Sequence, residues 1–293
     1  MTCLFIIQEG SFGINMKPGF LPIYKRDMRR FFRFKHQLLS SFLQPVLWLA
    51  FFGMAMAGNF DRIMGSNGSI HGVMEVSYLT FMCAGIIGAT ILFTNIFGGF
   101  FLLFDKNWGI LREIMASPLP RRNIIIGIGC AAITKSWIQS VTILVFGMIL
   151  GVTFFVGMSP LRIIISVIGF LLFVAAFATA FLCISLTIAL RIDSPEGFQG
   201  ISSLLTMPLF FLSNSLYPLE GLPPLMGTIA LLNPLTHLIT GIRYCTIGEH
   251  FSSIGMEVMY NSTEVLFSFL YLAIFALVMF TITLKTVEKV EIT

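Results

Sequence analysis

Long, continuous apolar runs dominate the chain, and they lack the alternation with period two that a membrane β-barrel strand would show. A helix needs about 20 such residues to cross the roughly 30 Å hydrocarbon core of a bilayer. Backbone amides in hydrocarbon must be hydrogen-bonded internally, so these runs predict transmembrane helices. The pattern predicts six of them, over Leu38–Ala57, Val76–Phe104, Ile124–Gly157, Ile163–Leu190, Phe198–Tyr217 and Val265–Leu284.

Composition supports this fold class, because 56% of the residues are hydrophobic and only 11% are charged. A soluble domain has about a quarter of its positions charged. We therefore expect an all-α integral membrane protein. Its predicted parts are an N-terminal extension over 1–16, an amphipathic helix over 17–37 and a single six-helix membrane domain over 38–290.

Lys and Arg in the connections predict the orientation, because these residues are retained on the cytoplasmic side. With the amino terminus inside, 14 of the 18 basic residues fall in cytoplasmic segments. Only Arg62, Arg162 and Arg243 fall outside, and Lys135 lies within the third run. This asymmetry predicts that both termini are cytoplasmic. It also accounts for the net charge of +4, so nucleic-acid binding is not needed to explain that charge.

The segment before the first run, Lys17 to Lys35, has the pattern of an amphipathic helix at the membrane surface. Its arginines share one helical face and its phenylalanines lie towards another. Such a helix either binds anionic lipid alone or also forms a cytoplasmic collar that touches a partner. The basic residues of this face are Arg26, Arg29, Arg30 and Arg33.

The connection between the second and third runs, Phe104 to Gly127, is too long for a simple turn. Leu111, Ile114 and Met115 have helical spacing, with Arg112 and Glu113 on the other side. Pro118 and Pro120 then end the pattern, because proline cannot continue a helix. We expect a short amphipathic cytoplasmic helix that either docks in a groove of a soluble partner or serves as a linker on the membrane surface.

The stretch between the fifth and sixth runs is apolar but is interrupted by Pro218, Pro223, Pro224 and Pro234. One straight helix cannot pass through these prolines. The pattern favours two short helices that enter the outer leaflet and return, and an outer surface loop is the alternative. A re-entrant geometry is tolerated where protein covers the irregular backbone.

Apart from Lys135, no charged residue lies within the six runs. Ion-coupled transporters usually keep such groups, so an apolar substrate pathway is favoured here. Lys135 is expected near the cytoplasmic boundary, with its amine reaching the headgroups, rather than in a transport pathway. Clusters of phenylalanine offer apolar walls for such a pathway, and the alternative is that they face lipid or pack between helices. The candidate pathway residues are Phe51, Phe52, Phe97, Phe210, Phe211 and Asn214.

The sequence contains no motif for a cofactor or metal of its own. No two histidines have ligand spacing, and no G-x-x-x-x-G-K-[ST] phosphate loop occurs. No catalytic constellation is visible within the runs. We therefore expect a chain that is not an enzyme, binds no metal, and leaves any ATP hydrolysis to another chain.

Two motifs resemble those of ABC type 2 permeases, the family of antibiotic-resistance and lipid-linked polysaccharide exporters. The first is the pattern Gly109, Leu111, Arg112 and Ser117 to Arg121, which resembles the coupling region of that family. The second, Leu231 to Tyr244, is similar to the segment before its last transmembrane helix. The resemblance extends over Met16 to Thr293.

This resemblance implies a permease that pairs with a second copy or a close relative and with two cytoplasmic ATPase subunits, which would bind ATP and Mg. It implies no nucleic-acid partner. Charged, partly exposed groups suit the contact with the ATPase, because they set orientation and partner choice. The implied coupling residues are Leu111, Arg112, Glu113, Ser117, Pro118, Leu119, Pro120, Arg121 and Arg122, with Arg191, Asp193 and Glu196 as a second contact.

The expected function is that of a multi-pass plasma-membrane permease subunit of an ATP-driven exporter, moving a hydrophobic or amphipathic drug or lipid out of the cell. Two alternatives stay open. One is the export of a lipid-linked polysaccharide, and the other is a channel or scaffold that does not use ATP.

Overall fold

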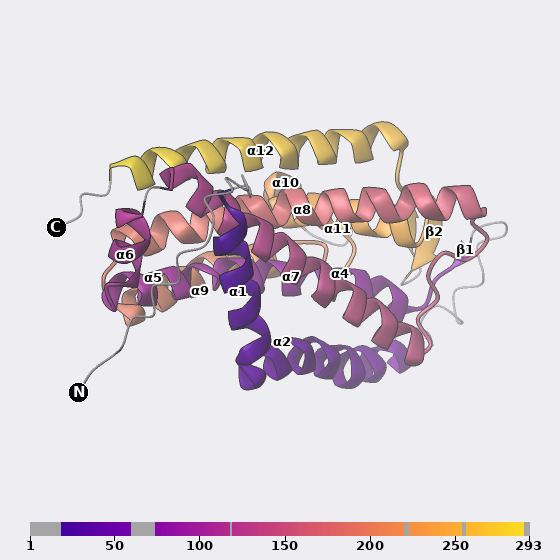
Figure 1. Ribbon diagram of the computed structural model, residues 1–293. Coiled ribbons are helices and arrows are strands. Elements are labelled where there is room, and N and C mark those ends of the chain that lie inside the picture. Colours follow the sequence, from indigo (N-terminus) through magenta and orange to yellow (C-terminus); the bar gives the residue numbers. More distant parts are fainter. Residues whose placement is uncertain (1–18, 60–73, 118, 220–222, 254–255, 290–293) are drawn as a thin grey trace.

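Nearly all regular structure in the computed structural model, which describes residues 19–59, 74–117, 119–219, 223–253 and 256–289, is helical (Figure 1). The elements are α1 (Leu21–Arg33), α2 (Lys35–Leu47), the π-helical η1 (Trp48–Gly53), β1 (Met74–Glu75), α4 (Tyr78–Ile96), α5 (Gly99–Asn107), α6 (Ile110–Ala116), α7 (Arg121–Ile149), α8 (Pro160–Arg191), α9 (Pro195–Phe211), α10 (Pro224–Leu232), α11 (Pro234–Thr246), β2 (His250–Ser253), β3 (Met256–Met259) and α12 (Ser262–Glu288).

Among the described residues, five helical segments are long and apolar enough to cross a membrane, over Leu38–Asn59, Tyr78–Asn107, Arg121–Ile149, Pro160–Arg191 and Ser262–Glu288. The all-α membrane fold is thereby confirmed. The predicted fifth span corresponds to α9, which has only 17 residues. α10 and α11 form a pair bent by 79° at Asn233, as a broken span or a re-entrant hairpin would be. The count of six spans and the orientation stay predictions.

α8 lies at the centre of the bundle and contacts α4, α5, α7, α9, α11 and α12. Its inward face carries Phe173, Phe177 and Phe181 at helical spacing, and all three are buried. The rings of Phe177 and Phe181 stack with centroids 4.3 Å apart. Such an aromatic stripe gives the bundle a continuous core along its length.

The two ends of the bundle carry different structures. Figure 1 shows α6 and the end of α12 at one end and the β-strands at the other. At the strand end, β1 pairs in parallel with β2, and β2 pairs antiparallel with β3. This small sheet was not expected from the sequence, because its strands are too short to show a periodic pattern.

The predicted second span is interrupted between α4 and α5 at Phe97 and Gly98. Ser185 of α8 fits into this interruption. Its hydroxyl accepts a hydrogen bond from the Gly99 amide at 2.9 Å and donates one to the Ile96 carbonyl oxygen. The hydroxyl therefore satisfies backbone groups that the break leaves without helical partners.

Two predicted spans were too long. α7 ends at Ile149 rather than Gly157, because Gly151, Phe155 and Gly157 adopt positive φ angles that no helix contains. α9 ends at Phe211 rather than Tyr217. There the Ser213 hydroxyl donates to the Phe210 carbonyl oxygen at 2.7 Å, a local bond that competes with helix continuation.

The predicted 17–37 helix is also corrected, because it divides at Phe34 into α1 and the start of α2. The extension over 1–16 lies outside the described residues. Arg243, predicted to lie in a segment on the outer side, is buried within α11 and is only 1% exposed, and its side of the membrane stays a prediction. Its guanidinium lies 3.5 Å from the centroid of the Phe81 ring and donates to the Asn214 carbonyl oxygen at 2.6 Å.

Candidate functional site

The predicted amphipathic helix between the second and third spans is present as α6, and its faces are as expected. Gly109 precedes it with φ 77°, a left-handed conformation that turns the chain sharply after α5. Leu111 is buried, and Ile114 and Met115 pack beside it against the bundle. Arg112 and Glu113 are exposed. The helix therefore presents a charged face outward while its apolar face fixes it to the protein.

The segment after α6 ends this helix and leads into α7. Ser117 ends α6 in an extended conformation, and its hydroxyl donates to the Ile114 carbonyl oxygen at 2.6 Å. Pro118 lies outside the described residues, Leu119 is half-buried and Pro120 directly precedes α7.

Arg121, at the first position of α7, connects the coupling segment to the last helix. Its guanidinium donates to the carbonyl oxygens of Val287 and Glu288 at 3.0 Å each. A cation at a helix C-terminus satisfies free carbonyl groups and favours the helix dipole. Arg122 is exposed. The two neighbouring arginines thus have different surroundings, although the family resemblance implies a coupling role for both.

The structure brings the second predicted contact, around Arg191 to Glu196, beside the first. Lys106 at the end of α5 lies 2.6 Å from the Asp193 carboxylate and donates to the carbonyl oxygens of Leu190 and Ile192 at 3.1 and 3.2 Å. The Asn107 side-chain amide donates to the Asp193 carbonyl oxygen at 3.0 Å. Arg191, Asp193 and Glu196 are all exposed. We call the exposed residues Arg112, Glu113, Arg122, Arg191, Asp193 and Glu196 the coupling surface.

The interface helix α1 is held at the same end by Asp105, next to Lys106. The Asp105 carboxylate is 4% exposed and forms ion pairs with Arg26 at 2.9 Å and Arg30 at 3.0 Å. Arg29 and Arg33 are exposed. The predicted four-arginine face is therefore divided between protein contacts and solvent. Sequence reasoning missed both Asp105 and Lys106, although charges directly after an apolar run were a usable signal.

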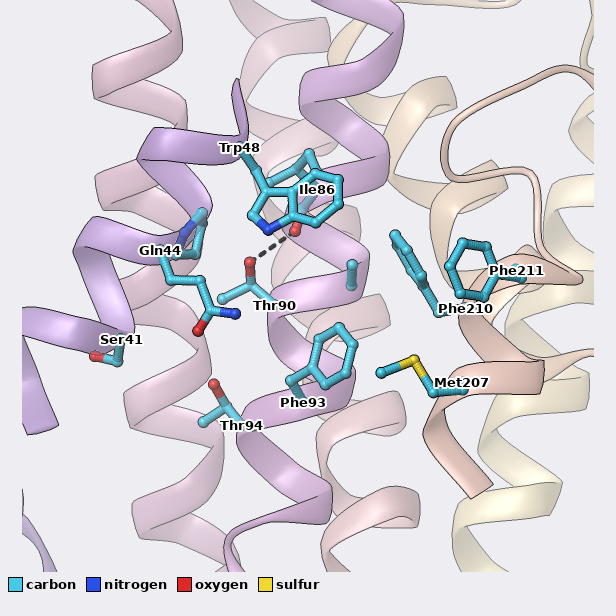
Figure 2. A pocket seen from close by; sticks show the side chains of 12 residues that line it. Ser41, Gln44, Trp48, Ile86, Thr90, Phe93, Thr94, Met207, Phe210 and Phe211 are labelled. Carbon is cyan, nitrogen blue, oxygen red and sulfur yellow. Dashed lines mark hydrogen bonds between the residues drawn. The ribbon is translucent and has the colours of Figure 1, made fainter. Parts of the chain in front are cut away.

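A second candidate site is an apolar cavity of ≈ 260 Å³ between α2, η1, α4 and α9, which we call the aromatic slot. Figure 2 shows Met207, Phe210 and Phe211 of α9 on one side and the polar groups of α2 and α4 on the other. Thr90 donates its hydroxyl hydrogen bond to the Ile86 carbonyl oxygen at 2.7 Å. The slot is lined by Ser41, Gln44, Pro45, Trp48, Ile86, Ala89, Thr90, Phe93, Thr94, Met207, Phe210 and Phe211.

The predicted pathway residues have different surroundings. Phe210 and Phe211 line the slot, and Phe97 lines the adjoining cavity. Phe51 is 73% exposed and Phe52 is 37% exposed, and neither lines the slot. Asn214 is buried, and its amide lies 3.4 Å from the Thr240 hydroxyl. Of the predicted pathway residues, only Phe210 and Phe211 therefore line the slot, and its other lining residues were not predicted from the sequence.

The adjoining cavity, which we call the polar chamber, has a volume of ≈ 270 Å³ between α1, α2, α4 and α7. It shares Ser41, Gln44, Phe93 and Thr94 with the slot. Lys135 and Gln139, one turn apart on α7, line it together with Asn95 of α4. Lys135 thus faces a cavity that it shares with Asp27 and Arg30 of α1, and whether its amine reaches the headgroups stays a prediction.

Similar proteins identify the family of this chain. Residues 19–247 match the family model described as ABC-2 type transporter. The ycf38 protein of Cyanophora paradoxa, named as a transport permease, is 30% identical over 295 residues, covering 100% of this chain and 93% of that protein. Inner membrane transport permease YadH of Escherichia coli (strain K12) is 24% identical over 77% of this chain and 82% of its own length. Nodulation protein J of Rhizobium leguminosarum bv. viciae is 23% identical over 75% and 79%. This multi-pass membrane chain belongs to the ABC-2 type transporter family.

Proposed function

We propose that this permease is the transmembrane subunit of an ATP-driven exporter that moves a hydrophobic or amphipathic drug or lipid out of the cell with a separate ATPase subunit. Family membership supports a transport role. The ATPase and the substrate are our inference from the geometry of two parts of the molecule.

The observation that carries the proposal is the joining of α6 and the Arg191–Glu196 loop into one surface. Lys106 and Asn107, which end α5 shortly before α6 begins, both contact Asp193 of this loop. The exposed charges of both segments then lie at one end of the bundle, where they would set the orientation of a soluble partner. A partner that contacted only α6 or only the Arg191–Glu196 loop would leave the charged residues of the other segment without a contact.

Movement of such a partner would reach the membrane helices through fixed contacts. α6 packs through Leu111 on a cluster that includes Leu102, Ile124 and Phe198, which belong to three different helices. Arg121 joins the same segment to the end of α12. A push on α6 would therefore displace several helices together, as in rigid-body switching between two packed states.

The aromatic slot supports the choice of substrate class. Its lining is mostly apolar, with a few hydroxyl and amide groups on one side. Ligand sites of this composition accept apolar molecules and use the polar groups to fix their orientation. A hydrophobic or amphipathic substrate suits these walls better than a small ion.

The test is affinity purification of the tagged permease in mild detergent, followed by an ATPase assay of the proteins that co-purify. Glu113→Arg reverses an exposed charge on α6, and we expect it to remove most of the co-purifying ATPase activity. Glu75→Arg makes the same change at the strand end and should retain that activity. If no ATPase accompanies the wild-type protein, the exporter proposal is wrong and an ATP-independent channel or scaffold is favoured.

A further inference from the structure

The polar chamber contains buried polar atoms that lack hydrogen-bond partners. Gln139 is 1% exposed, and neither its amide oxygen nor its amide nitrogen has a hydrogen-bond partner among the described residues. Exchanging the two atoms in the side chain would not change this result. Buried polar groups without partners are rare in folded proteins, because each has lost its bonds to water. Both atoms therefore have unused hydrogen-bonding capacity beside the chamber.

Asn95 faces the same chamber from α4, and only one of its two side-chain polar atoms is hydrogen-bonded. Its amide nitrogen donates to the Ile91 carbonyl oxygen at 2.7 Å and to the Ser136 hydroxyl at 3.0 Å. These two bonds fix the orientation of the amide, because only the nitrogen can donate. Its amide oxygen is buried without a partner. The chamber thus offers one donor from Gln139 and acceptors from both amides.

Lys135 adds a positive charge to these groups. Asp27, which lines the same chamber, is already engaged with Arg26 at 3.1 Å. Lys135 is attracted by Asp27 and repelled by Arg30 and Arg26, and its amine lies 5.8 Å from the centroid of the Phe31 ring. Within the described part of the chain, no hydrogen bond or ion pair reaches this amine. A charge within a membrane span is costly, and such residues usually bind something.

The chamber and the aromatic slot adjoin each other. Four lining residues belong to both, and the volumes of ≈ 260 and ≈ 270 Å³ are each smaller than typical ligand pockets of roughly 300–1,000 Å³. The slot is aromatic and apolar. The other carries the Lys135 amine, which has no ion-pair partner among the described residues, and amide groups with unpaired atoms. A molecule that fits both cavities has an apolar chain and an anionic head.

We propose that the polar chamber binds the phosphate-bearing headgroup of a membrane amphiphile whose chain lies in the aromatic slot. Phosphate oxygens accept from the Lys135 ammonium and the Gln139 amide nitrogen, and charge-assisted bonds of this kind are strong. Hydroxyl groups on the same head donate to the free oxygens of Asn95 and Gln139. The predicted ligand is therefore an anionic, hydroxylated phospholipid or lipid phosphate. The view that this ligand is also carried rests on the proposed function.

Binding can be measured on the full-length permease in phosphatidylcholine nanodiscs without any ATPase. Trp48 lines the slot, so a brominated acyl chain that enters it quenches tryptophan fluorescence. The probes are brominated phosphatidylglycerol, whose head carries a phosphate and hydroxyl groups, and brominated phosphatidylcholine. Trp48 is 42% exposed, so lipid outside the slot also quenches it, and only the difference between the two lipids in the quenching lost in Trp48→Phe is assigned to the slot. We expect half-maximal quenching at about tenfold less phosphatidylglycerol, since one charge-assisted bond gives a preference of that order.

The variants separate the chamber from general attraction to the membrane surface. Lys135→Gln should abolish the preference, and Lys25→Gln, which removes an exposed charge from α1, should retain it. Gln139→Leu should weaken the preference while leaving the melting temperature equal or higher, because it removes two buried polar atoms without partners. A purely structural role for Gln139 would not produce this combination.

Three results would overturn the proposal. The first is equal quenching of the wild type by both lipids. The second is a preference that is lost in Lys25→Gln but kept in Lys135→Gln, which indicates surface attraction. The third is displacement of the lipid by millimolar inorganic phosphate, which indicates a site for the free anion. Loss of ATPase co-purification with intact lipid preference would instead contradict only the exporter function.

Discussion

The Lys106 ammonium lies 2.6 Å from the Asp193 carboxylate and thereby joins the end of α5 to the loop between α8 and α9. The two members of this pair are unequal. The Asp193 side chain is 87% exposed, whereas Lys106 is 27% exposed and also donates to two carbonyl oxygens at the end of α8. Lys106 therefore contributes most of the connection, as a cation at a helix C-terminus.

Lys106→Met should destabilise the protein by about 1–2 kcal/mol, because it removes bonds from a charged donor to free carbonyl groups. Asp193→Asn should change stability by less than about 0.5 kcal/mol, since an exposed ion pair contributes little. Thermal unfolding of the purified variants in detergent measures both. An equal loss in the two variants would contradict the assignment of the connection to the carbonyl contacts.

Asp105→Asn should release α1 from the bundle. The change leaves Arg26 and Arg30 without their carboxylate partner, and removing one member of a mostly buried ion pair costs several kcal/mol, here about 2 because the arginines are partly exposed. Hydrogen exchange of the amides over Leu21–Arg33 should become faster. Arg29→Gln, at an exposed position on the same helix, is the control and should leave exchange unchanged.

Gly109→Val should strain the turn between α5 and α6. Its φ of 77° is unfavourable for a β-branched residue, and the space around it is open, so the cost of about 1–2 kcal/mol comes from the backbone alone. Gly109→Asn should cost less, because asparagine tolerates this conformation. Gly129→Ala, also in open space but inside α7, should be neutral or stabilising. Melting temperatures in the reverse order would show that this turn is not under conformational constraint.

Arg243→Lys should destabilise the protein strongly although it keeps the charge. The guanidinium lies on the Phe81 ring and donates to the Asn214 carbonyl oxygen, a combination that lysine cannot reproduce. We expect a loss of about 2 kcal/mol or more. Arg162→Lys is the matched control, because Arg162 forms an exposed pair with Glu249 and its replacement should cost less than about 0.5 kcal/mol. Thermal unfolding compares the two changes directly.

The fold class and the short helix α6 could be predicted from the sequence because their causes are local. An apolar run long enough to cross a bilayer becomes a helix whatever surrounds it, since the backbone must satisfy itself in lipid. The spacing of Leu111, Ile114 and Met115 likewise marked the buried face of α6. Helix ends were predicted less well. The apolar pattern continues past Ile149 and Phe211, where glycine conformations and serine hydrogen bonds end the helices.

By itself, the sequence determined that the chain is a helical membrane protein with a charged connection after its second span. Only the tertiary structure decided that Asp105 holds α1, that Lys106 joins the end of α5 to the Asp193 loop, and that Lys135 and Gln139 face one chamber beside the aromatic slot. Each of these arrangements depends on side chains from segments far apart in the chain. Their proximity follows from how the helices pack around α8. The spacing of apolar residues along each helix does not predict which helices pack together.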